Sequence, residues 1–492
     1  MNKSLQLYHR FTIILLSIVI TYSCQDRVIE VVDKSPPNYS TITQINFSSH
    51  ILPIFEGNCL TASCHNTNNA AGGLILNSWE NIFRGSRSGA VIVSGNPSMS
   101  HLIQVINTDT SISPVSFPQM PLGRNPLQKE QVLFLKRWID EGAKNDAGEL
   151  PFTHLKNGRV FVTNQSSDLV AVIDIATNLL MRYVKIGSLM DGAILGAPHH
   201  VRVDKKGEFF YTTLINAQEL WKYSAMTYEF IKKVSIQPSP ADVILTTSGD
   251  TAIVTNFSTN PQVAALIETK NMKILATYTL PSFLRPFVTF SHGALLSHDG
   301  QWLYTSNQGS GNLTAINIRD GSMNLISLDT SGVFITLTQP YLADQSPDGR
   351  YIYVACYGTN DVRVIDRFVD TGRVTRIIPV GKRPLHVKVS ADGKYVLSAN
   401  QGSDDVTVIQ TTDYSTTTIP DVGRQPHGVD FSPDGKYVYV TCENRTEAIP
   451  PHHPTIGSRG ISFVSVIDFD VRRVIRRIEV GGFAAGISIA DP

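Results

Sequence analysis

The sequence lacks an excess of either charge, because its 42 lysines and arginines equal its 42 aspartates and glutamates. This balance gives no support to a nucleic-acid partner or to a strongly charged protein partner. After residue 20 the chain also lacks an apolar run of membrane-spanning length. Cysteine is scarce, with five in 492 residues. Such a length is too great for one small core, so we expect at least two domains.

The first residues have the order of a secretory signal. Lys3 and Arg10 precede the apolar run 11–20, which is too short to span a bilayer. A small residue stands directly before Cys24, and the segment resembles a bacterial lipoprotein processing site with an imperfect consensus. The resemblance implies a signal peptide over 1–24 and lipidation of Cys24. An ordinary signal peptide with an incidental Cys24 is the alternative.

Residues 25–44 include Pro36 and Pro37, and we expect them to form a flexible linker. By the same resemblance, the protein would be exported and held on the bacterial outer membrane by its lipid, on the periplasmic or the surface face.

A pair of cysteines followed at once by a histidine is the most informative motif of the chain. Cys59, Cys64 and His65 supply the two thiols and the imidazole that covalent attachment of a c-type haem requires. Each thiol would form a thioether with a haem vinyl group, and His65 would be the proximal iron ligand. Four residues separate the cysteines, where two are usual. A disulfide between them is therefore the alternative in an exported protein.

A methionine flanked by prolines follows later in the chain. Pro118 and Pro121 keep Met120 on a stiff extended loop rather than in a helix. A thioether on such a loop suits the distal face of a haem, where Met/His ligation raises the reduction potential. His101 or Met99 is the alternative distal ligand.

Apolar positions with helical spacing, from Val132 to Ile139, predict a helix that closes this region. Together with the motifs above, the pattern resembles the small cytochrome c domain of bacterial multidomain proteins over residues 45–148. The resemblance implies an all-α domain that carries one covalent haem c, with His65 and Met120 as the axial ligands.

The last two-thirds of the chain repeat one pattern. A segment such as 426–442 combines a strand, an Asp-Gly turn and a second strand, and it recurs at spacings of 42 to 51 residues. Two further strands follow in each unit, and four antiparallel strands per unit are typical of a β-propeller blade. The repeating turn glycines are Gly207, Gly249, Gly300, Gly349, Gly393 and Gly435.

Counting the units predicts a seven-bladed β-propeller over 152–492. Six units are complete, and the fragment 158–187 joins the chain end 482–489 in the seventh, which removes exposed sheet edges. The pattern resembles the propeller family named for its Tyr-Val-Thr-Asn signature. The expected fold is therefore multidomain, with a small all-α cytochrome c domain before an all-β propeller. Cys356 and Cys442 fall in blades that are not neighbours, and we expect them to be buried packing residues.

Histidines gather at one position of the repeat. The two residues after the repeating proline open the innermost strand of a blade and should face the central channel; in the last blade this pair is taken as Phe483 and Ala484. A metal or a second cofactor bound in the channel is one interpretation. Hydrogen bonds from these histidines to neighbouring blades are the other. The candidate ligands are His199, His200, His292, His386 and His427.

These features favour an exported, lipid-anchored c-type cytochrome that exchanges single electrons with a redox partner protein. The propeller would be a docking or substrate-binding platform, and no catalytic residue is indicated. The domain order resembles that of cytochrome-type nitrite reductases, and the blade count with its paired histidines resembles nitrous oxide reductase. Both distant resemblances imply a first alternative, a periplasmic redox enzyme with a metal or second cofactor in the channel. The second alternative is a binding module with a structural haem domain.

Overall fold

The computed structural model describes residues 37–61, 64–152, 158–187, 196–369, 372–446, 448–449 and 460–490. The expected signal peptide and Cys24 lie outside these ranges. Gln44–Pro492 form one compact unit, and the described part of the preceding unit contains the short 3-10 helix η1 (Tyr39–Thr41). Across the described ranges, no helix has both the length and the apolar character needed to cross a bilayer.

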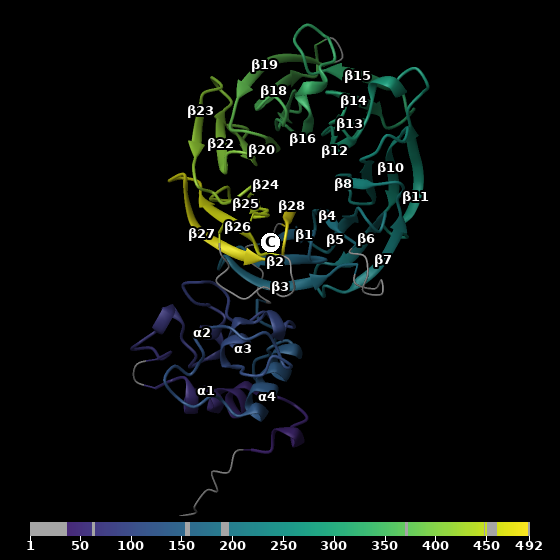
Figure 1. Cartoon of the computed structure of the whole chain (residues 1–492). Coiled ribbons are helices and arrows are strands. Elements are labelled where there is room, and N and C mark those ends of the chain that lie inside the picture. Colours follow the sequence, from purple (N-terminus) through teal and green to yellow (C-terminus); the bar gives the residue numbers. More distant parts are fainter. Residues whose placement is uncertain are drawn as a thin grey trace, which may run out of the picture. The chain divides into compact units, whose positions relative to one another are not determined.

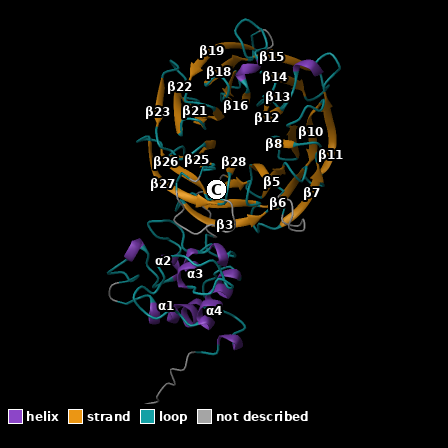
Figure 2. Cartoon of the chain, in the orientation of Figure 1, coloured by secondary structure: helices purple, strands orange, loops and turns teal. Residues whose placement is uncertain are grey.

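The N-terminal domain is built from short helices joined by loops, which Figure 2 draws in purple and teal. Its core forms around α4, where Trp138 is buried and its ring centroid lies 5.8 Å from that of Phe47. The backbone N–H of Gln128 donates to the side chain of Gln131 at the start of α4, at 3.2 Å. The helical elements are η2 (Phe47–Ile51, a π-helix), α1 (Leu52–Asn58), η3 (Ala71–Gly73), α2 (Trp79–Ile82), η4 (Pro97–Met99), α3 (His101–Ile106) and α4 (Lys129–Asp140).

The described residues from 158 onwards form seven four-stranded antiparallel sheets, which confirms the predicted fold class. Figure 1 shows the sheets arranged in a ring. The first sheet joins the two ends of the propeller, because β28 pairs with β1. From the channel outwards, the first three sheets are β28 (Ala484–Ala490), β1 (Arg159–Asn164), β2 (Leu169–Asp174) and β3 (Leu179–Lys185); β4 (Pro198–Val203), β5 (Phe209–Leu214), β6 (Glu219–Ser224) and β7 (Phe230–Ser235); and β8 (Pro240–Leu245), β9 (Thr251–Asn256), β10 (Gln262–Glu268) and β11 (Lys273–Thr279).

The remaining four sheets follow in chain order around the ring. They are β12 (Ser291–Leu296), β13 (Trp302–Asn307), β14 (Asn312–Asn317) and β15 (Met323–Ser327); β16 (Pro340–Gln345), β17 (Tyr351–Cys356), β18 (Asp361–Asp366) and β19 (Arg373–Pro379); β20 (Pro384–Val389), β21 (Tyr395–Asn400), β22 (Asp405–Gln410) and β23 (Thr416–Ile419); and β24 (Pro426–Phe431), β25 (Tyr437–Cys442), β26 (Ser462–Asp468) and β27 (Arg473–Val480). Two short 3-10 helices, η5 (Arg285–Phe287) and η6 (Thr336–Thr338), lie in connections between sheets.

Apolar side chains pack between neighbouring sheets, so the two central strands of each blade are buried on both faces. All six residues of β1 and of β2 are buried, whereas β7 at the rim is exposed along most of its length. Cys356 and Cys442 are both fully buried free thiols in two different clusters between blades. Burial of this kind explains the near-continuous apolar runs of the central strands.

A break in the ladder opens every innermost strand. In β24 the pairing shifts register between Pro426 and Val429, so the N–H of Gly428 has no strand partner. The hydroxyl of Thr441 accepts this N–H at 2.7 Å and donates to the carbonyl of Ala485 in the next blade, also at 2.7 Å. The threonine of the repeat signature thus ties each of several blades to its neighbour. The equivalent residues that make both bonds are Thr163, Thr213 and Thr255.

Replacing Thr441 with valine should lower the free energy of unfolding by about 1–3 kcal/mol, because it leaves a buried N–H and a buried carbonyl unpaired while keeping the side-chain shape. Chemical denaturation followed by circular dichroism measures the change. Thr441→Ser keeps the hydroxyl and should cost less than Thr441→Val. Equal losses for the two variants would contradict a role for the hydroxyl.

Candidate functional site

The two thiols of the haem motif lie close together at the end of α1. Cys59 is buried, the Sγ of Cys64 accepts a hydrogen bond from the hydroxyl of Thr61 at 3.2 Å, and the backbone N–H of His65 donates to the carbonyl of Cys59 at 3.1 Å. Burial raises the pKa of Cys59 to about 12; the nearby Cys64 also raises this pKa, and Arg124 lowers it. The four-residue spacer therefore still leaves Cys64 close enough to act on Cys59, with His65 directly after the pair.

His65 has a nitrogen without a hydrogen-bond partner in the described residues. Its Nδ1 is buried, while its backbone carbonyl accepts the N–H of Leu76 at 2.9 Å, which fixes the start of the following loop. A buried imidazole nitrogen without a partner is costly in a closed core. Two adjacent thiols and such an imidazole are the donor set that a covalent haem c needs, so the residues fit this group.

The loop that carries Met120 is fixed against α3. The N–H of Met120 donates to the carbonyl of Val105 at 2.7 Å, and the side chain of Gln119 donates to the carbonyl of Asn107 at 3.0 Å. Met120 is half-buried. Arg124, four residues further on, is close enough to lower the pKa of Cys59. The end of the methionine loop therefore lies near the cysteine pair.

The two alternative distal ligands have other surroundings. Met99 packs against the apolar cluster of the first and last sheets, which includes Val160 and Val480. His101 is the first residue of α3. The contacts of Met99 with the propeller favour Met120 over Met99 as an iron ligand.

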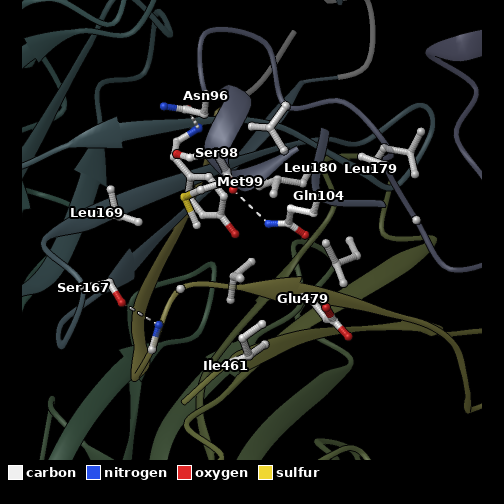
Figure 3. A pocket seen from close by; sticks show the side chains of 18 of the residues that line it. Asn96, Ser98, Met99, Gln104, Ser167, Leu169, Leu179, Leu180, Ile461 and Glu479 are labelled. Carbon is white, nitrogen blue, oxygen red and sulfur yellow. Dashed lines mark hydrogen bonds between the residues drawn. The ribbon is translucent and has the colours of Figure 1, made fainter. Parts of the chain in front are cut away.

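A cavity of about 700 Å³ lies between the N-terminal domain and the propeller (Figure 3). Met99 and Gln104 line it from one side, and Leu169 and Ile461 line it from the other. The side chain of Gln104 donates to the carbonyl of Ser98 at 2.8 Å. The lining mixes polar and apolar side chains and includes none of the channel histidines.

The mouth of the propeller channel forms a second cavity, of about 370 Å³. Two rings of side chains line it. The second residues of six innermost strands make one ring, and the residues directly after the second strand of each blade make the other. The first ring consists of His199, Ala241, His292, Tyr341, Leu385 and His427; the second consists of Gln165, Ile215, Phe257, Gln308, Tyr357, Gln401 and Glu443; Arg445 and Phe483 complete the lining.

The assignment of Phe483 and Ala484 to the channel pair of the last blade is wrong by two residues. Ala484 pairs with Asn164 as Pro198 pairs with Leu214, so Ala484 occupies the place of the repeating proline. The carbonyl that accepts from the neighbouring threonine is that of Ala485. The chain end has no proline to mark its register, which is why the sequence misled. Phe483 reaches the cavity from the position before the strand.

Three of the predicted channel histidines come together. Each of His199, His200 and His292 is buried and offers a ring nitrogen, and the three nitrogens lie within 4.8 Å of one another. The Nε2 atoms of His199 and His292 are 3.1 Å apart, and Nδ1 of His200 lies 3.1 Å from Oδ1 of Asp242. Burial lowers the pKa of His199 and of His292 well below the usual value, so both rings are neutral near pH 7.

His427 belongs to a different group. Its Nδ1 lies 2.7 Å from Oε1 of Glu443, and its Nε2 lies 3.4 Å from the hydroxyl of Tyr341. Burial would raise the pKa of Glu443, but His427, Arg445 and Gln401 together hold it below its ordinary value. Both nitrogens of His427 thus have partners, and the carboxylate beside it is ionised.

His386 does not join the three histidines. Its Nδ1 accepts the backbone N–H of Val429 at 2.8 Å. Burial lowers the pKa of His386 well below the usual value, which suits an acceptor nitrogen. This is the hydrogen bond to a neighbouring blade that the alternative interpretation of the channel histidines expects.

Sequence reasoning missed Asp242, Glu443, Gln165 and Arg445. Asp242 stands in the repeat position of His200, one blade on, and Glu443 stands directly after a second strand. The repeat itself carries the signal for Glu443, since the residue after the second strand lines the channel in all seven blades. Arg445 lies beyond the repeat, and its place, with Nε 2.5 Å from Oε2 of Glu443, follows from the fold alone.

Comparison with known families divides the chain in the same way. Residues 61–115 match the family described as Planctomycete cytochrome C, and residues 156–384 match the family described as Lactonase, 7-bladed beta-propeller. The first match includes Cys64 and His65 and ends before Met120. A search of curated proteins found no match to the sequence.

Two solved structures show the same propeller fold. One is a functionally unknown protein from Desulfotomaculum acetoxidans DSM 771, with 14% identity, a TM-score of 0.51, and coverage of 68% of this chain and 99% of that chain. The other is a protein from Bacteroides uniformis ATCC 8492 described as a candidate 6-phosphogluconolactonase, with 14% identity, a TM-score of 0.51, and coverage of 68% of this chain and 100% of that chain. The chain therefore carries a domain similar to the Planctomycete cytochrome C family, followed by a seven-bladed β-propeller similar to the lactonase family.

Proposed function

We propose that the protein is a c-type cytochrome that exchanges single electrons with a redox partner protein. The observation that carries the proposal is that Cys64 lies near the thiol of Cys59 and directly before His65, in a domain that matches a cytochrome c family. A cytochrome c domain implies haem c, whose iron takes up and releases one electron at a time. In this proposal Cys59 and Cys64 hold the haem, and His65 is its proximal ligand.

Met120 is the distal ligand in this proposal. Its loop is held to α3 by backbone and side-chain hydrogen bonds, so a ligand there would be positioned before haem attachment. A thioether ligand raises the reduction potential of a haem relative to a second imidazole. The sequence has one Cys–Cys–His group, which supports a single haem per chain.

The propeller serves as a platform in this proposal. The cavity at its channel mouth offers the neutral imidazoles of His199 and His292, several amides, and the ionised carboxylate of Glu443 beside His427. This lining also supports a second candidate, a redox enzyme whose substrate binds at the channel mouth. Export and a lipid on Cys24, with attachment to the outer membrane, complete the proposal and rest on the sequence.

Replacing Cys59 and Cys64 together with alanine should abolish covalent haem, because both thioether bonds are lost. Denaturing gels stained for haem measure this, and the unmodified protein should give a stained full-length band. Cys356→Ala removes a buried thiol of the propeller and should keep the stain. Extraction of the haem from the unmodified protein into acidified organic solvent would contradict covalent attachment.

Met120→Ala should remove the weak sulfur-to-iron absorption band near the red end of the spectrum and lower the reduction potential, because the iron loses its thioether ligand. Spectra of the oxidised protein and a redox titration measure both effects. Met99→Ala should leave the band and the potential unchanged. The reverse pattern would assign the distal position to Met99.

Cys24→Ser should leave the protein in the soluble fraction or with its signal uncleaved, because serine cannot receive the lipid. Fractionation of cells that express the full chain, with mass spectrometry of the N-terminus, measures this. Membrane association with normal processing in Cys24→Ser would show that the anchor lies elsewhere.

A further inference from the structure

Two blades bring the three converging histidines into the channel, His199 and His200 on β4 and His292 on β12, and the fold fixes their backbones. The carbonyls of His199 and His292 each accept a threonine hydroxyl from the neighbouring blade, and the N–H of His200 donates to Thr213. The side chains of all three histidines are at least nine-tenths buried. The three nitrogens that converge therefore belong to residues of hydrogen-bonded strands rather than to residues of loops.

In His199 and in His200, Nδ1 donates its proton in a hydrogen bond, and the lone pair of Nε2 is left for a ligand. Gln165 Oε1 lies 3.0 Å from Nδ1 of His199, and it accepts the proton there, which leaves the lone pair on Nε2. Asp242 accepts the proton on Nδ1 of His200 in the same way, and Nε2 of His200 is then the nitrogen left for a ligand. That Nε2 atom is buried and has no hydrogen-bond partner in the described residues.

Asp242 is itself held in place. Its Oδ2 accepts the backbone N–H of Ala294 at 3.0 Å, and its Oδ1 faces His200. A carboxylate that accepts the proton of one imidazole nitrogen fixes the ring and makes the other nitrogen a better metal ligand. Asp242 is thus a positioning residue for His200.

The spacing of the His199 and His292 nitrogens matches that of two ligands of one metal ion. At metal–nitrogen distances of about 2.0–2.1 Å, two ligands of a tetrahedral ion lie about 3.3 Å apart. The Nε2 atoms of His199 and His292 lie 3.1 Å apart, and the third nitrogen is within 4.8 Å. One proton shared between the two Nε2 atoms accounts for the 3.1 Å contact of His199 with His292. It does not account for the buried Nε2 of His200, which has no hydrogen-bond partner in the described residues.

We propose that His199, His200 and His292 bind one transition-metal ion of the kind that prefers imidazole, such as Cu²⁺ or Zn²⁺. Three protein ligands leave a fourth position, and His199 and His292 line the channel cavity, so that position is open to a small ligand from the cavity. His427 and His386 fall outside this group. The two nitrogens of His427 face Glu443 and Tyr341, and Nδ1 of His386 accepts the N–H of Val429. The site does not depend on the proposed haem ligands.

Cu²⁺ alone is the probe for this site. The full-length, haem-loaded protein is purified without chelator, stripped with a chelator, mixed with one equivalent of Cu²⁺ and passed through a desalting column. Elemental analysis should then find one copper per chain beside the haem iron. The electron paramagnetic resonance spectrum of the copper should show superhyperfine splitting from three nitrogens.

Two variants and a matched control locate the copper. His200→Gln should weaken Cu²⁺ binding at least 100-fold, and Asp242→Asn, which keeps all three imidazoles, should weaken it by about 10–100-fold. His386→Gln alters the same repeat position as His200 on another blade and should leave the affinity unchanged. Circular dichroism of each variant checks that the propeller is folded.

A desalted protein without copper would overturn the proposal, as would equal copper affinity in His200→Gln and His386→Gln. If His200→Gln does not fold, the spectrum of the unmodified protein still decides. Splitting from three nitrogens supports the site, and splitting from one or none overturns it. Loss of the haem by Cys59→Ala with Cys64→Ala should leave copper binding intact, which separates this site from the proposed cytochrome function.

Discussion

The channel depends on one break in the hydrogen-bond ladder of every blade. Between the first and the fourth residue of each innermost strand the register shifts, as between Pro426 and Val429. The break frees one N–H that the ladder cannot satisfy, and in four blades a threonine hydroxyl accepts it. Because the same hydroxyl reaches the next blade, the irregularity that aims side chains at the channel also joins the blades. The same break in the ladder therefore affects both the contact between neighbouring blades and the direction of the side chains in the channel.

The sequence predicted the propeller because its turns and strand ends repeat at nearly fixed spacing. It misplaced the last innermost strand, because Ala484 stands where six blades have proline or serine and nothing in the local sequence marks that register. The register is set instead by a contact with a distant residue, the bond from Thr441 to Ala485. Local pattern gave the number of blades, and tertiary contact gave the alignment of the closing strand.

The two sites differ in how much of them the sequence reveals. The thiols and imidazole of the haem motif lie close together in the chain, so the local sequence brought out Cys59, Cys64 and His65 despite the unusual spacing of the cysteines. In the channel, the repeat gave the position of each histidine along its strand, but the partners are set by the fold, some in the same blade and some in a neighbouring one. Val429 engages His386, and Glu443 engages His427. Hydrogen bonds to such groups decide which histidine rings point toward one another. The spacing of residues along the sequence does not reveal these contacts.

Closure of the ring by β28 places a demand on the order of events during synthesis and export. The first blade receives its innermost strand from the end of the chain, so β1 has a free edge until the last residues have been delivered. A haem domain near the start can fold long before that moment. Without β28, β1 would keep an unpaired edge that another strand could join, so the integrity of the first blade depends on residues 484–490.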